Sequence, residues 1–202
     1  MNKMLLSSAL ALSVMSGSAM AAVTTGQLTF NWQAVVPSAP VTSTTWAFVD
    51  GRDIPFVPGT EQLRVTRDDS GIKAVSVTPY DFFIVPVDGK VVEGTPVTRA
   101  ADTVNIKNAV KVYLASSPVS NGLVGNKQLA LSTTAQAAAG NIAINVNGTP
   151  LKIGSLAATT IGKTSDKDEH VDIDMNASIA KADVADGASI SFVAPVVFAV
   201  DI

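Results

Sequence analysis

The residues with the greatest capacity for chemistry lie in one short stretch, DKDEHVDIDM at residues 166–175. In a strand, this alternation places His170, Asp172 and Asp174 on one face and the apolar residues between them on the other. One imidazole with two carboxylates is a donor set for a divalent metal ion. A solvated strand face opposite a buried one explains the same residues. We therefore expect no metal site here and no cofactor.

Other arrangements for catalysis are missing from the sequence or have a simpler explanation. The chain has one histidine and no cysteine, which excludes a multi-histidine zinc site and a cysteine nucleophile. His170 has no G-x-S-x-G partner for a serine mechanism. Acidic pairs in VDGRD (49–53) and RDDSG (67–71) resemble those of glycosidases, but each lies beside a turn glycine, and turn formation explains it better. We expect no catalytic residues and no enzymatic activity.

The start of the chain predicts export. Lys3 precedes a short apolar stretch, and small residues at 19 and 21 match a cleavage pattern, so residues 1–21 are expected to be a signal peptide. Removing Lys3 leaves 13 basic and 17 acidic side chains, a net charge of −4 with no basic tract. This charge argues against a nucleic-acid partner. Because an exported chain without cysteine has no disulfide, its stability must rest on burial or on a partner.

Short alternating segments between turn signals predict an all-β fold. Glycine follows Asp, Ser or Asn at 51, 71, 89, 122, 148 and 187, and segments rich in Val, Ile, Thr and Phe lie between these turns. This pattern favours an antiparallel sandwich. The Ala-rich residues 133–140 are a turn of helix at most. The predicted internal strands are 63–66, 72–78, 81–87, 110–115, 128–133, 141–146, 150–153 and 170–175.

Both ends of the mature chain are predicted to be amphipathic strands. Every even position from Ile190 to Ile202 is apolar, and Pro195 within this strand predicts an edge position or a bulge. The N-terminal strand is either the first strand of the domain's own sheet or a strand added to a neighbour's sheet. The pattern alone favours its own sheet. The apolar face of this strand consists of Leu28, Phe30, Trp32, Ala34 and Val36.

Five long stretches of the sequence are distinctive: LTFNWQAVVPSAPVTS, FVDGRDIPFVPGTEQL, VTPYDFFIVPV, PVSNGLVGNKQLALST and FVAPVVFAVDI. They resemble the pilins of the chaperone–usher pathway. The resemblance is closest to the major shaft subunits of enterotoxigenic Escherichia coli colonization factors of the coli surface antigen five and seven type. It covers nearly all of the mature chain. It implies an immunoglobulin-like sandwich at 37–202 that is incomplete and is completed by a donated strand, residues 22–36 of another subunit.

The resemblance also implies how such a domain is completed. A periplasmic chaperone first covers the groove beside the C-terminal strand and holds the carboxylate of Ile202 with basic residues. At the outer-membrane usher, the N-terminal strand of the next subunit replaces it, with Leu28, Phe30, Trp32, Ala34 and Val36 as the donor face. Gly26 precedes this face, whereas many such pilins have a glycine within it, so the register stays open. The residues expected at the groove edge are Ile190, Phe192, Phe198, Val200 and Ile202.

The predicted function is that of a structural major subunit of an adhesive fimbria on the bacterial surface. Its expected partners are identical subunits arranged head to tail, the chaperone, the usher and a minor tip adhesin, and a host-cell surface receptor stays open. One alternative is a fimbrial tip adhesin or a secreted carbohydrate-binding adhesin. A tip adhesin needs no donor strand, so the strand at 26–36 and the single-domain length favour the shaft. The other alternative, a secreted hydrolase, lacks the residues described above.

Overall fold

The structure is a computed structural model that describes residues 24–31, 45–162 and 167–202. The expected signal peptide and the predicted donor residues Trp32, Ala34 and Val36 lie outside these ranges. Within them, no helix has the length and apolar character needed to span a membrane. The strands are β1 Thr24–Asn31, β2 Trp46–Val49, β3 Leu63–Asp68, β4 Gly71–Ser76, β5 Tyr80–Pro86, β6 Val110–Leu114, β7 Val119–Asn121, β8 Ala130–Leu131, β9 Asn141–Val146, β10 Thr149–Pro150, β11 Thr159–Ile161, β12 Glu169–Ile179 and β13 Ser191–Val200.

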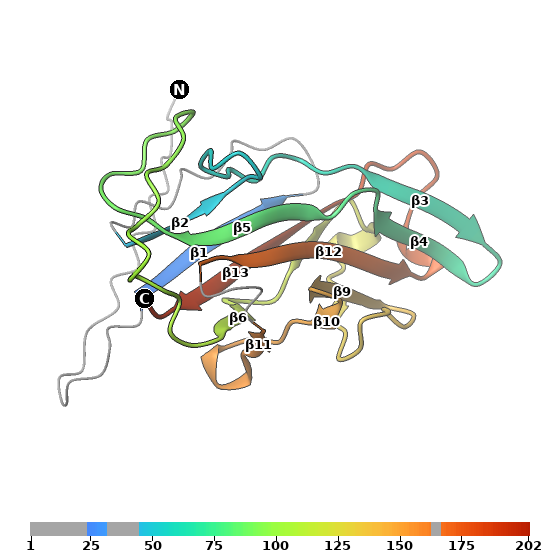
Figure 1. The fold of residues 1–202 in the computed structure, drawn as a ribbon. Helices are drawn as coiled ribbons and strands as arrows, with labels where there is room; N and C mark the ends of the chain where they lie inside the picture. Colours follow the sequence, from blue (N-terminus) through green and yellow to red (C-terminus); the bar gives the residue numbers. More distant parts are fainter. Residues whose placement is uncertain (1–23, 32–44, 163–166) are drawn as a thin grey trace, which may run out of the picture.

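These strands form two sheets (Figure 1). The first has the order β1-β13-β6-β11, and β7 also pairs with β13. The second has the order β10-β9-β12-β4-β3, with β5 on β12, β2 on β5 and β8 on β9. Only the short β8–β9 pair is parallel among the described strands. The structure therefore confirms the predicted all-β, immunoglobulin-like sandwich.

Aromatic side chains form the centre of the core between the two sheets. The Phe198 ring of β13 lies edge-on to Phe48 of β2 and Phe82 of β5, with ring centroids 5.0 and 5.8 Å apart. Trp46 packs edge-on against Phe48, and Phe56 stacks on Phe82. Edge-on and offset-stacked rings are the favoured arrangements of aromatic pairs. This cluster joins the two sheets close to the C-terminal end of β13.

The predicted strands agree with the structure where apolar residues recur at every second position of the sequence. β3, β4, β5, β6, β9 and β12 all lie on predicted segments. The segments 128–133 and 150–153 reduce to the two-residue strands β8 and β10, and no helix forms at 133–140. The predicted turn at Asn147 and Gly148 joins β9 to β10 as a tight hairpin in which both residues have positive φ. β2 escaped prediction because all four of its residues are buried, so it shows no alternation.

Candidate functional site

The N-terminal strand lies beside the last strand of the same chain (Figure 1). β1 pairs antiparallel with β13, from Thr24 opposite Val200 to Asn31 opposite Val193. On its other side, β13 pairs with β6 and β7, so the described part of β1 forms the edge of this sheet. In a single chain, the strand therefore occupies its own sheet, the first of the two interpretations. Donation of the same strand to a neighbour stays a prediction.

The inner face of β1 completes the core. Leu28 and Phe30 are fully buried and lie opposite Val196 and Ala194 of β13. The Phe30 ring lies 4.8 Å from the ring of Tyr80, on the second sheet. Gly26, also buried, lies opposite Phe198 on the same face, so the inner face begins two residues before Leu28, the first residue of the predicted face. A residue without a side chain thus lies opposite one of the largest side chains of β13.

The predicted groove-edge residues have two kinds of environment. Phe192, Phe198 and Val200 are fully buried, whereas Ile190 and Ile202 lie just beyond the ends of β13 and are partly buried against the core. The described part of β1 lies opposite residues 193–200. It therefore faces Phe198 and Val200, and Phe192 lies beyond its end.

Pro195 does not interrupt the pairing of β13 with β1. It lies between the residues of β13 that pair with β7 and those that pair with β6. Its carbonyl oxygen accepts a hydrogen bond of 2.9 Å from the Ala115 N–H, on the side away from β1. Because the N–H and C=O of one strand residue point to the same side, the missing N–H of Pro195 also lies on that side. β13 has partners on both sides and a continuous register against β1, so neither the predicted edge position nor a bulge in this pair occurs in the docked chain. The proline instead marks a change of partner strand on the other side.

The groove is the position along β13 that β1 fills, and its two ends lie near different parts of the chain. Thr45, which leads into β2, lines the same shallow pocket as Ile202, beside the Val200 end of β13. β1 ends at Asn31, opposite Val193, at the other end of the pairing. Eight strand residues span about 27 Å at roughly 3.4 Å per residue. A docked strand therefore leaves the groove far from the point where the sandwich itself begins.

The structure brings His170 together with Asp81 and Asp172 but not with Asp174. His170 Nε2 lies 2.9 Å from Asp81 Oδ1 and 3.8 Å from Asp172 Oδ1. Asp174 instead accepts a hydrogen bond of 2.8 Å from the Asn145 side chain. The apolar residues between them are fully buried, as predicted. Asp81 was missed because it lies on β5, 89 positions from His170, and only the register of β5 against β12 makes them neighbours.

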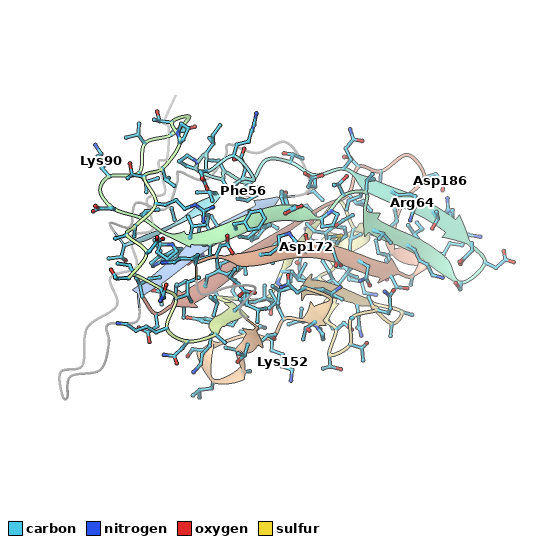
Figure 2. All side chains as sticks on the ribbon, viewed as in Figure 1. Phe56, Arg64, Lys90, Lys152, Asp172 and Asp186 are labelled. Carbon is cyan, nitrogen blue, oxygen red and sulfur yellow. The ribbon has the colours of Figure 1, made fainter. Side chains whose placement is uncertain are left out.

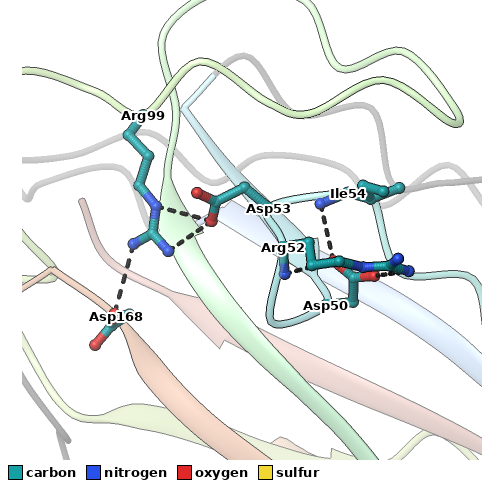
Figure 3. Close-up of polar contacts among 6 residues, drawn as sticks. All are labelled: Asp50, Arg52, Asp53, Ile54, Arg99 and Asp168. Carbon is teal, nitrogen blue, oxygen red and sulfur yellow. Dashed lines mark hydrogen bonds and ion pairs between the residues drawn. The ribbon is translucent and has the colours of Figure 1, made fainter.

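One acidic residue of each turn motif organises its turn, as predicted. Asp50 Oδ1 accepts hydrogen bonds from the N–H groups of Arg52 and Ile54, at 2.8 and 3.0 Å (Figure 3). Desolvation raises the pKa of Asp50, but these bonds and the Arg52 guanidinium lower it more, so its pKa lies below the ordinary value. Asp68 accepts hydrogen bonds from the N–H groups of Ser70 and Gly71. The hydrogen bond from the Ser70 hydroxyl is the largest cause that lowers the pKa of Asp68.

The second carboxylate of VDGRD is held in an ion pair. Asp53 Oδ1 accepts hydrogen bonds of 2.9 and 2.6 Å from the Arg99 guanidinium, which also lies 3.5 Å from Asp168 (Figure 3). The hydrogen bond to Asp53 is the largest cause that raises the pKa of Arg99. Asp50 and Asp53 therefore bind separate groups rather than facing a common cleft, and this arrangement offers no acid–base pair for hydrolysis.

Comparison with known proteins gives one clear relationship. Over 201 residues, the chain is 61% identical to the CS5 fimbrial subunit of Escherichia coli, and the match covers 98% of each chain. No protein-family model matches the sequence. No solved structure matches it either.

Proposed function

Because this chain belongs to the family of CS5-type fimbrial subunits, we propose that it polymerises by donor-strand exchange, with β1 leaving its own sheet for the same position in a neighbour. A fimbrial subunit is a structural protein, is exported, and assembles with identical subunits into a fimbria on the cell surface. Donor-strand exchange is the mechanism that we propose for this assembly. The pairing of β1 with β13 carries this proposal, because β1 completes the core through a single edge contact.

The covalent connection permits the exchange. Within the described residues, β1 pairs with β13 and with no other strand. Residues 32–44 join it to the sandwich, and thirteen residues reach at most about 45 Å. This reach exceeds the length of the groove of about 27 Å estimated above from the rise per residue, so the segment is long enough to return to its own groove. The same length is available to extend toward another subunit, which is the condition for swapping an identical element.

The positions of the two ends favour a filament over a closed dimer. In an exchanged assembly, each subunit receives a strand along β13 and sends its own strand out from Thr45, beside Ile202. The received strand leaves at the other end of the groove, opposite Val193. Donor and acceptor contacts thus use different surfaces, which makes the contact heterologous, and a heterologous contact that does not close produces a fibre.

An empty groove needs a temporary partner. Without β1, the backbone groups of β13 that face it are unpaired, and the apolar strip that includes Phe198 and Val200 is uncovered. An exposed apolar edge strand of this length is an aggregation hazard. A periplasmic chaperone that adds a strand along β13 removes this hazard, and an outer-membrane usher then exchanges it for β1 of the next subunit. A minor adhesin at the tip receives a strand and donates none.

A disulfide across the β1–β13 pair tests the proposal directly. Gln27 lies opposite Val197, and the backbone groups of Val197 point away from β1, as those of Pro195 do. Such non-hydrogen-bonded pairs have Cα atoms about 4.5 Å apart, within reach of a disulfide. In fimbriae carrying Gln27→Cys with Val197→Cys, we expect oxidation to produce a ladder of covalent multimers on a denaturing, non-reducing gel.

The natural chain has no cysteine, so every disulfide in this experiment is the engineered one. The single variants Gln27→Cys and Val197→Cys are the controls, and neither is expected to give a ladder. A band of monomer size that migrates as an internally cross-linked chain, from assembled fimbriae, would contradict the exchange. That result would assign β1 to its own sheet in the fimbria as well.

A further inference from the structure

We propose that Asp81, His170 and Asp172 bind a divalent transition-metal ion on the outer face of the second sheet. Asp172, shown on β12 in Figure 2, lies directly opposite Asp81 of β5, and His170 lies two residues before it on the same face. This is the only group of three metal-ligating side chains that converge within the described residues. It lies on the sheet that does not contain β1, so it is separate from the groove.

The distances suit a metal of the size of zinc. The three candidate ligand atoms all lie within 4.8 Å of one another, and His170 Nε2 lies 2.9 and 3.8 Å from its two carboxylate neighbours. With bonds of about 2.0–2.2 Å, the ligands of a tetrahedral zinc ion lie roughly 3.3 Å apart. The observed distances lie on both sides of this value, so small side-chain rotations are enough to form the site.

The backbone beneath the site is held in place. The Asn147 side chain donates a hydrogen bond of 3.1 Å to the carbonyl oxygen of His170 and accepts one of 2.8 Å from the N–H of Asp172. The His170 ring also lies against Phe83, with ring centroids 5.0 Å apart. A site on strands whose backbone is fixed by such contacts loses little freedom when it binds an ion.

The charges around the site favour a cation. Like charges directly opposite each other on neighbouring strands are destabilising, and Asp81 and Asp172 form such a pair. In the described parts of the chain, the only ion-pair partner of either carboxylate is His170, and neither carboxylate forms an ion pair with a lysine or arginine. Imidazole with carboxylates is a donor set suited to zinc and to other late transition metals. Three protein ligands leave a further position for water or for a ligand from outside the chain.

Zinc binding to assembled fimbriae tests this site. Fimbriae are equilibrated with micromolar Zn²⁺ and sedimented, and the bound zinc per subunit is measured by mass spectrometry. We expect saturation near one zinc per subunit. We expect His170→Gln and Asp81→Asn each to weaken the apparent affinity at least about tenfold. X-ray absorption is expected to show one imidazole nitrogen on the zinc, which must come from His170 because it is the only histidine.

Asp174→Asn is the matched control. Asp174 lies on the same face of β12 but contacts Asn145, so its loss is expected to leave zinc binding unchanged. We expect all three variants to form fimbriae normally, which would show that each variant subunit still folds. Failure of the wild-type fimbriae to retain zinc, or equal binding by His170→Gln, would overturn the proposal. A loss with Asp174→Asn as large as that with His170→Gln would do the same.

Discussion

A chain of residues 37–202 is expected to melt about 6–24 °C below one whose groove is filled by β1. Leu28 and Phe30 are fully buried, and burial of each such side chain contributes about 1.5–3 kcal/mol. Their sum of roughly 3–6 kcal/mol is a large part of the total stability of a typical domain. The measurement is thermal unfolding followed by circular dichroism.

Filling the groove from the other end of the same chain is expected to restore this stability. Thr24 lies opposite Val200, so residues 22–36 joined after Ile202 of the 37–202 chain by a short flexible linker enter the groove as the second strand of a hairpin. This chain should not polymerise, because its groove is occupied and it has no N-terminal strand to donate. Equal melting temperatures with and without the added copy would show that the strand has no groove to fill.

A pair of substitutions in the added copy separates burial from the mere presence of a strand. Phe30→Ala removes the ring that packs against Tyr80 and should cost about 3–5 kcal/mol. Gln27 is exposed on the opposite face of the same strand, so Gln27→Ala should change the free energy of unfolding by less than about 0.5 kcal/mol.

Gly122→Ala is expected to destabilise the domain by at least about 3 kcal/mol, the second large effect. Gly122 follows β7 with a φ of 82°, a conformation that costs other residues about 1–2 kcal/mol. A Cβ atom at this position would lie 1.9 Å from the carbonyl oxygen of Ser189. Relief of this clash must displace the backbone that leads into β13, the strand that forms the groove. Urea unfolding measures the loss.

Gly125→Ala provides the comparison for this prediction. Gly125 has a similar φ of 66°, but a Cβ atom there meets nothing within 4 Å. We therefore expect only the conformational cost of about 1–2 kcal/mol. Similar losses of unfolding free energy for the two variants would mean that the close approach of Gly122 to Ser189 adds nothing to the cost of Gly122→Ala.

The sequence was sufficient to predict strands that bury one face. Every second residue is apolar from Val171 to Ile179 in β12 and from Phe192 to Val200 in β13, and both strands were found within a few residues of their bounds. β2 is buried on both faces, so its four residues carry no periodic signal. The three-residue strands β7 and β11 are too short to show a period. The meeting of Asp81 and His170 depends on the register between distant strands, and no local pattern encodes it.

The sequence was enough to predict which residues of β1 are buried, but not whether they are buried in their own subunit or in a neighbour. Leu28 and Phe30 were identified as an inner face, and both are buried. Gly26 was placed before this face rather than on it, because a position without a side chain gives no hydrophobic signal. The sequence cannot distinguish a strand in its own sheet from a donated strand, because both arrangements bury the same side chains against the same strand. Only a measurement that separates one chain from two, such as the Gln27–Val197 disulfide, resolves this.

The opposite positions of Thr45 and Asn31 along β13 have a mechanical consequence for a fimbria built by exchange. Tension along such a fibre pulls the acceptor subunit at one end of β13 and the inserted strand at the other. The inter-strand hydrogen bonds run perpendicular to the strands, so this pull loads the whole ladder in shear rather than peeling one bond at a time. A joint loaded in this way resists rupture until many bonds break together, which suits a fibre under flow.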